Sequence, residues 1–276
     1  MAIKHSYILK YLALALFCCS VLNVYSQKKS GVHTIVIDPG HGGRQWGATV
    51  PLQSHKPRLM EKDINLAVSL KFGALVEEWF PDVKVLYTRK DDSFVDFHER
   101  SDLANKNNAD LFISIHANSE ETLTASGSET YIMGLHTSEE NLKVAMYENS
   151  FMTDEENYQE KYDGFDPTDD SSYVIMFSFL QGVYLEKSLR MAEFIQEEFQ
   201  NGPIKRDRGV KQAGFYVLFK TATPSVLIEL GYMSNPTEEK ILTDPNCQQE
   251  MAECIFRAFK KYKQITDEDA YNSLQE

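Results

Sequence analysis

Three apolar, strand-like runs in this sequence each lead into a side chain that could bind a metal ion or transfer a proton. These side chains are His41 in IDPGHGG, His116 in LFISIHANS and Glu229 in SVLIELGYMSN. A second carboxylate, Glu61, opens a long helical pattern. Zinc hydrolases use these residue types: three side chains hold the ion, water takes its open position, and a further carboxylate moves the proton. The sequence predicts such chemistry if the fold brings the four residues together.

The pattern around these residues predicts a fold that would do so. Short, continuously apolar runs rich in Ile and Val are typical of strands buried on both faces. They alternate with helical patterns, which favours a single α/β domain with a mostly parallel, twisted sheet flanked by helices. Ligands gather at the carboxyl ends of parallel strands. His41, His116 and Glu229 would lie at that edge, and the helix beginning at Glu61 would return to it. The expected strands are TIVID (34–38), VKVLYT (83–88), DLFISI (110–115), GSETYIM (127–133, half exposed) and PSVLI (224–228).

Helical periodicity predicts the remaining elements. Residues 61–80, 96–108 and 172–200 are expected to be helical, with a closing helix near 246–263 followed by a frayed acidic tail over 265–276. Cys247 and Cys254 would both lie on the closing helix, about 10 Å apart, which is too far for a disulfide. We expect buried free thiols instead.

The segment 135–170 breaks this alternation. It contains eleven acidic residues against two lysines. Loops this long within a compact domain are uncommon, and those that occur are often lids. Its portion EENLKVAMYENSFM (139–152) predicts a short amphipathic helix. The alternative is a solvated acidic insertion without a role.

The first 26 residues are expected to be a secretory signal peptide. Lys4 and Lys10 precede an apolar run that ends at small Ser26, so cleavage is expected near Ser26–Gln27. Lipid attachment at Cys18 or Cys19 is the less favoured alternative. The protein would then be exported to the periplasm or cell envelope, and no later run is long and apolar enough for a transmembrane anchor.

The charge of the chain excludes two classes of partner. The formal net charge is −13, and it becomes −15 without the two lysines of the signal peptide. A chain this acidic repels nucleic acid and anionic membrane surfaces.

The four chemical candidates differ in how unusual their sequence positions are. His41 lies between two glycines, which allow close approach of the backbone. His116 ends an apolar strand, and Glu229 interrupts an apolar run, where a carboxylate needs a partner or a function. Glu61 alone is unremarkable, because acidic residues favour the first turn of any helix. The other histidines, His5, His33, His55, His98 and His136, are expected to be surface or ordinary core residues.

The sequence resembles the zinc-dependent N-acetylmuramoyl-L-alanine amidases of bacterial cell walls, the Amidase_3 family, in four ordered blocks. The resemblance implies one Zn²⁺ per chain held by His41, Glu61 and His116, with Glu229 as the catalytic acid/base. It also implies a catalytic domain over 32–264, a sheet of about six strands, and cleavage of the amide between N-acetylmuramic acid and L-alanine in peptidoglycan. The blocks are IDPGHGGRQWGA (37–48), EKDINLAVSLKFGALVEE (61–78), LYTRKDDSFVDFHERSDLANKNNADLFISIHANS (86–119) and PSVLIELGYMSNPTEEKIL (224–242).

The position of the acidic segment adds a regulatory expectation. In family members that serve daughter-cell separation, a helix there covers the groove, and one of its glutamates fills the open zinc position. By placement this implies Glu148 as a zinc plug, with Glu139, Glu140, Glu155 and Glu156 as competitors. The expected partner is a coiled-coil activator with a degenerate peptidase-like domain, which would displace the helix.

Two other functions remain open from the sequence. A zinc exopeptidase acting on free peptides would use similar ligands, although such enzymes commonly hold two metal ions. A wall-binding module that had lost catalysis would have no need of Glu229 beside all three ligands.

Overall fold

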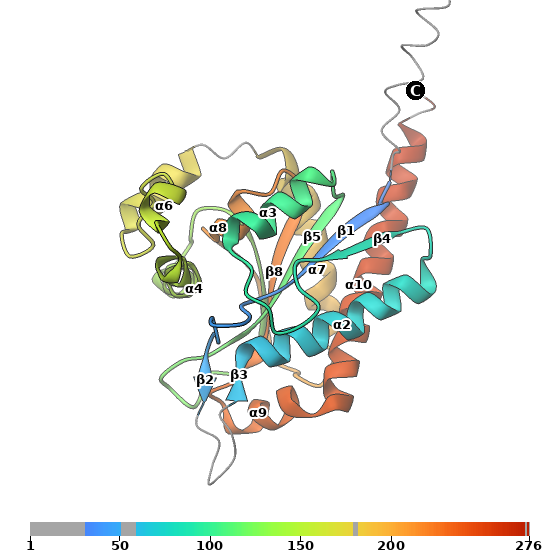
Figure 1. Ribbon diagram of the computed structural model, residues 1–276. Coiled ribbons are helices and arrows are strands. Elements are labelled where there is room, and N and C mark those ends of the chain that lie inside the picture. The colour runs from blue at the N-terminus through green and yellow to red at the C-terminus, as the bar shows by residue number, and fades with distance from the viewer. Residues whose placement is uncertain (1–30, 51–58, 179–181, 274, 276) are drawn as a thin grey trace, which may run out of the picture.

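A computed structural model of the protein describes residues 31–50, 59–178, 182–273 and 275. The predicted signal peptide and its cleavage point lie outside these residues. Within them, six strands form one sheet in the order β4-β1-β5-β8-β6-β7 (Figure 1). Within this six-stranded sheet only the β6–β8 pair is antiparallel, so the predicted mostly parallel α/β sheet is confirmed. The strands are β1 (Thr34–Pro39), β4 (Lys84–Tyr87), β5 (Leu111–Asn118), β6 (Ser128–Met133), β7 (Asp207–Ala213) and β8 (Ser225–Tyr232).

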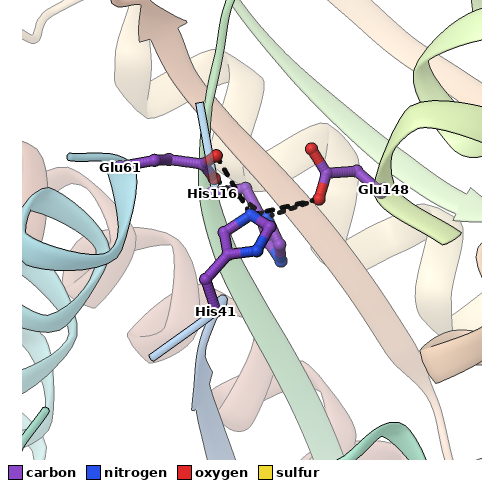
Figure 2. Close-up of side chains that lie close together, drawn as sticks. All are labelled: His41, Glu61, His116 and Glu148. Atoms are coloured by element: carbon purple, nitrogen blue, oxygen red, sulfur yellow. Dashed lines mark hydrogen bonds and ion pairs between the residues drawn. The ribbon is translucent and has the colours of Figure 1, made fainter. Parts of the chain in front are cut away.

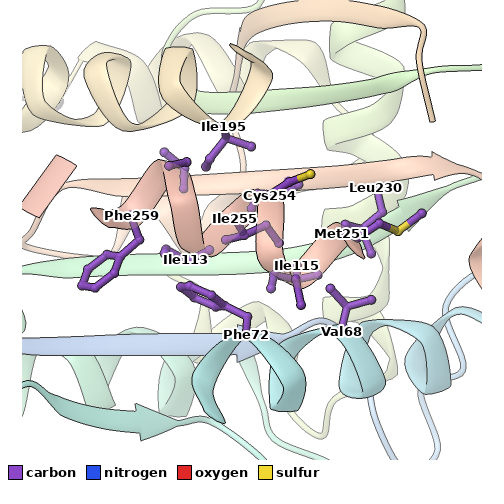
Figure 3. Close-up of a cluster of buried hydrophobic side chains, with 14 of the residues drawn as sticks. Val68, Phe72, Ile113, Ile115, Ile195, Leu230, Met251, Cys254, Ile255 and Phe259 are labelled. Atoms are coloured by element: carbon purple, nitrogen blue, oxygen red, sulfur yellow. The ribbon is translucent and has the colours of Figure 1, made fainter. Parts of the chain in front are cut away.

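Helices cover both faces of this sheet. On one face, α2 (Glu61–Trp79), α7 (Leu185–Phe199) and α10 (Pro245–Asn272) pack over a core that includes Ile113 and Ile115 (Figure 3). The neighbouring residue Phe112 points into a second core on the opposite face. Side chains alternate between the faces of a strand, so a strand buried on both faces must be apolar throughout. The second face is covered by α3 (Phe97–Lys106), α4 (Glu139–Ser150), α6 (Asp170–Ser178) and α8 (Tyr216–Phe219).

Short elements lead the chain into α2. Strands β2 (Thr49–Val50) and β3 (Leu59–Met60) pair antiparallel immediately before this helix. The N–H group of Glu61 donates to the carbonyl of Ala48 at 3.0 Å, which places the first residue of α2 against the loop that follows β1. Among the described residues, no helix combines the length and the apolar character needed to cross a membrane.

The sheet differs from the sequence expectation at its β6–β7 edge. Strand β6 was expected to be half exposed, but all six of its residues are buried, because α4 and its neighbours cover the second face. Strand β7 was not predicted. Its sequence DRGVKQA is polar, and it pairs in parallel with β6 at the edge of the sheet.

Two helical predictions were wrong in extent. The expected helix over 172–200 is divided into α6, a 3₁₀ turn at Gly182–Tyr184 (η2) and α7, with 179–181 outside the described residues. The expected frayed tail over 265–276 is helical as far as Asn272. Asp267 accepts a hydrogen bond from the Val32 N–H group at 2.9 Å, and Asp269 pairs with Arg190 at 2.8 Å. These contacts order the polar last turns of α10, which have few apolar residues to pack against the rest of the domain.

The acidic segment 135–170 is folded rather than a solvated loop. The predicted amphipathic helix is present as α4, and the 3₁₀ helix η1 (Phe151–Asp154), α5 (Tyr158–Lys161) and the start of α6 follow it. Ala145, Met152 and Tyr162 are buried in the second core. Cys247 and Cys254 are both free, and only Cys254 is buried.

Candidate metal centre and catalytic site

Side chains from four parts of the chain converge at the carboxyl end of the central strands (Figure 2). His41 Nε2 lies 3.0 Å from Glu61 Oε2 and 3.2 Å from Glu148 Oε2. His116 Nδ1 lies 3.0 Å from Glu61 Oε1 and 3.2 Å from the same Glu148 oxygen. One potential ligand atom of each side chain lies within 4.8 Å of the others, and all four residues are buried. The structure thus brings His41, Glu61 and His116 together and adds Glu148 from α4.

Glycines make the close packing of this cluster possible. A Cβ atom on Gly40 would lie 2.4 Å from the ring of His116, and one on Gly47 would lie 2.4 Å from Glu61 Oε2. His41 itself has a φ of 59°. A residue with a side chain adopts this left-handed conformation at a cost of about 1–3 kcal/mol, which the surroundings must offset.

Two buried arginines hold the turn that carries His41. Arg100 Nη2 donates to the carbonyl oxygen of His41 at 2.8 Å, and Arg89 Nη2 donates to that of Gly40 at 2.8 Å. Buried Asp38 accepts from Arg100 Nη1 at 2.7 Å. Burial opposes ionisation of Asp38, but Arg100 and two hydroxyl donors hold its pKa below the ordinary value. Sequence reasoning missed these residues, because arginines within polar segments are normally surface residues.

Glu61 is fixed by hydrogen bonds as well as by the histidines. Its Oε2 accepts from the Ala48 N–H group at 2.9 Å, and its Oε1 accepts from Asn65 Nδ2 at 2.9 Å. Burial alone would raise the pKa of Glu61, but His41 and His116 hold it well below the ordinary value. This carboxylate is therefore ionised and oriented towards both imidazoles.

The cluster attracts positive charge. Burial alone would lower the pKa values of His41 and His116, yet the neighbouring carboxylates of Glu61 and Glu148 raise both. Two carboxylates and two imidazoles are also a donor set that suits a divalent cation such as zinc.

The spacing of the donor atoms fits such a cation. Bonds of about 2.0–2.2 Å in tetrahedral geometry place ligand atoms about 3.3–3.6 Å apart. The ion-pair distances here are 3.0 and 3.2 Å. His41 Nε2 and Glu148 Oε2 are buried and make no hydrogen bond of good geometry to the described residues, although they face each other. Two buried polar atoms this close without a hydrogen bond are more typical of metal ligands than of a structural pair.

Glu229 lies beside this cluster. It is fully buried on β8, directly opposite His116 on β5, so the two side chains project to the same face of the sheet. Neither carboxylate oxygen has a hydrogen-bond partner among the described residues. Burial and the charge of Glu148 raise the pKa of Glu229 well above the ordinary value. A buried carboxyl group with no partner and a raised pKa is a candidate proton carrier, because structural carboxylates are normally paired.

The acidic segment supplies one glutamate to the cluster. Of the five glutamates considered from the sequence, only Glu148 approaches the histidines. Glu155 is buried elsewhere, where it accepts from Tyr162 Oη at 2.5 Å and Lys161 Nζ at 2.8 Å. Glu140 pairs with Arg208, and Glu139 and Glu156 are exposed.

Comparisons with known proteins agree on one family. The family model described as N-acetylmuramoyl-L-alanine amidase, Amidase_3, matches residues 35–261, which include every residue of the cluster. The chain belongs to this amidase family. It is 32% identical over 230 residues to the N-acetylmuramoyl-L-alanine amidase AmiC of Escherichia coli O6:H1, a match that covers 83% of this chain and 52% of AmiC. The chain thus spans about half the length of that relative.

Solved structures of amidases share the fold. The amidase AmiC2 of Nostoc punctiforme aligns with a TM-score of 0.60 and 28% identity over 85% of this chain and 99% of that one. The CwlD amidase of Clostridioides difficile, solved in complex with the GerS lipoprotein, aligns with a TM-score of 0.61 and 28% identity. That match covers 84% of this chain and 99% of CwlD. The amidase fold therefore accounts for nearly all of the described domain.

Proposed function

We propose that this chain is an N-acetylmuramoyl-L-alanine amidase, which hydrolyses the amide between N-acetylmuramic acid and L-alanine in peptidoglycan. The observation that carries the proposal is the convergence of His41, Glu61 and His116 beside the unpaired carboxyl group of Glu229. Membership of the amidase family is the reason for proposing this amide as the bond that is cut and peptidoglycan as the polymer that contains it.

Zinc is the proposed cofactor, one ion per chain, with His41, Glu61 and His116 as its ligands. When bound, zinc would polarise the carbonyl of the scissile amide and lower the pKa of the attacking water. Asn65 and the Ala48 N–H group hold Glu61 in the orientation that this ligand set needs. Arg100 does the same for the His41 turn through the carbonyl oxygen of His41.

Glu229 is the proposed proton carrier. Its carboxylate would accept a proton from water as the water oxygen bonds to the amide carbon. The resulting carboxylic acid would donate that proton to the nitrogen as the carbon–nitrogen bond breaks, which releases a peptide with a free L-alanyl amino terminus. Burial and the charge of Glu148 favour the protonated form, so the proton is readily held until the nitrogen takes it.

Glu148 is proposed to restrain the activity of the enzyme while α4 covers the site. Its Oε2 atom lies 3.2 Å from a nitrogen of each histidine, where it would compete for the ligand position that water needs. Release requires a partner that binds the open state better than the closed one. A coiled-coil activator with a degenerate peptidase-like domain is the proposed partner. A protein partner has a parallel in CwlD, which was solved with GerS.

The proposed location is the periplasm or cell envelope, after removal of residues 1–26. There the enzyme would act in cell separation or wall turnover. The hydrophobic start of the chain and the peptidoglycan substrate both support export.

The test is clearing of purified peptidoglycan by the intact protein, with and without a chelator. We expect clearing that the chelator abolishes and that added zinc restores. A wall-binding module would clear nothing in either condition, and an exopeptidase would cleave free peptides but leave glycan-linked peptide in place.

A further inference from the structure

A row of charged side chains crosses the sheet from the metal centre to the edge strand β7. His116 on β5 is opposite Glu229 on β8, and Glu229 is opposite Glu129 on β6. Residues paired across neighbouring strands project to the same face, so all three lie on the face that α4 covers. Arg208 Nε and Lys211 Nζ on β7 donate to Glu129 Oε2 at 2.7 and 2.5 Å.

The basic end of this row carries one positive charge more than Glu129 can neutralise. Glu129 is fully buried, and its other oxygen accepts from Asn118 Nδ2 at 3.1 Å and Tyr131 Oη at 2.9 Å. Its single negative charge is shared by Arg208 and Lys211. The carboxylate that balances them comes from α4: Glu140 forms ion pairs with Arg208 Nη2 and, at 3.8 Å, with Lys211 Nζ.

Glu140 is poorly suited to a purely structural role. Its side chain is 49% exposed, whereas those of Arg208 and Lys211 are 16% and 15% exposed. An ion pair with one exposed partner contributes little to stability. Arg208 and Lys211, in contrast, are held in place by buried Glu129 whether or not Glu140 is present.

We propose that Arg208 and Lys211 form a subsite for a free carboxylate of the stem peptide, and that Glu140 occupies this subsite while α4 covers the sheet. An arginine fork beside a lysine matches a carboxylate in charge and geometry. Glu140 and Glu148 lie eight residues apart on α4, about 12 Å along the helix. One helix therefore blocks the metal centre with Glu148 and the peptide subsite with Glu140.

The distance between β7 and Glu229 limits which carboxylate of the stem peptide could be bound. Strand β7 lies two strand spacings from β8, about 10 Å from the backbone of Glu229. An extended peptide covers about 3.3–3.6 Å per residue. The carboxylate therefore belongs to one of the first three residues on the amine side of the cleaved bond. This assignment rests on the proposed amidase function.

The experiment compares two soluble muramoyl peptides that differ only in whether the free carboxylates of the first three residues are intact or converted to carboxamides. We expect kcat/KM of the parent protein to be higher for the carboxylate form by about ten-fold or more, because a charged hydrogen bond is lost in the other. Arg208→Gln should remove this preference by raising KM for the carboxylate form. Lys205→Gln, which removes an exposed charge from the same segment, should retain it.

Equal kcat/KM values for the two substrates in the parent, or an unchanged preference in folded Arg208→Gln, would overturn the subsite. If Arg208→Gln does not fold, Glu140→Gln decides: it should lower KM for the carboxylate form alone, and an equal change for both substrates would contradict the proposal. Cleavage of neither peptide by the parent or by Glu148→Ala protein would count against the amidase function instead. Calorimetric binding of both peptides to Glu229→Gln protein would then still test the subsite.

Discussion

His41, Glu61 and His116 come from three distant parts of the sequence, yet their nitrogen and oxygen atoms pair at 3.0 Å. The left-handed turn at His41 and the close approach of Gly40 to His116 show how tightly this geometry is specified. Residue types and strand ends were enough to predict this convergence. The arginines and Asp38 beneath it could not be predicted, because their role depends on burial that no local pattern reveals.

Loss of His116 should remove the metal. We expect His116→Ala protein to retain little zinc in elemental analysis, because one of the three proposed ligands and one of the two imidazoles of the cluster are lost. His136→Ala is the matched control, since His136 lies outside the cluster and pairs with Asp170 at 3.5 Å. Full zinc content and full activity in His116→Ala would contradict the ligand assignment.

Loss of Glu229 should affect chemistry and leave the metal in place. Glu229→Gln preserves the shape of the side chain but cannot carry the proton, so kcat should fall by about 10²–10⁴-fold. Elemental analysis should show zinc at the parent level. Near-normal turnover in this variant would exclude Glu229 from the mechanism.

Loss of Glu148 should increase activity. In Glu148→Ala, the ion pairs that hold α4 over the two histidines are absent, so peptidoglycan hydrolysis without an activator should rise by about ten-fold or more. Lys143→Ala serves as the control, because Lys143 is an exposed residue of the same helix. If the two variants are equally active, Glu148 does not inhibit the enzyme.

At the scale of elements, α4 is attached to the domain at a point separate from the metal centre. Asn149 Nδ2 donates to the carbonyl of Gly214 at 2.8 Å, and its Oδ1 accepts from the Tyr216 N–H group at 2.9 Å. Asn149 is 1% exposed. The closed position of α4 therefore depends on a buried amide as well as on Glu148.

Asn149→Ala should loosen this attachment without changing any proposed ligand. Leaving the buried Tyr216 N–H group without its partner costs about 1–3 kcal/mol. Hydrogen exchange of the α4 amides should become faster, and activity without an activator should rise. Unchanged exchange and activity in a folded variant would show that Asn149 does not control the position of α4.

The elements themselves were predictable where their side chains form an apolar pattern. The central strands β1, β5 and β8 were expected, since burial on both faces requires an apolar run. Edge strand β7 has no such apolar run. Its pairing with β6 and the charged side chains around Glu129 hold it in place instead. The last turns of α10 are also polar, and the contacts of Asp267 and Asp269 order them.

At the scale of the whole molecule, the acidic segment is part of the domain core. Met152 and Tyr162 of this segment pack with Tyr131 and Phe215 beneath it. Replacing 139–170 with a flexible loop would therefore expose apolar surface, and single substitutions are the better test of inhibition. The net charge of −13 also gives the protein little general attraction to an anionic polymer, so recognition depends on local groups such as Arg208 and Lys211.

Mass spectrometry of the fragments released from purified peptidoglycan tests the central claim most directly, because it identifies the bond that is cut. The amidase function predicts stem peptides that begin with a free L-alanyl amino terminus, together with glycan strands whose N-acetylmuramic acid carries a free lactyl carboxylate. Release of peptides still linked to sugar, or of fragments cut only within the peptide, would contradict it.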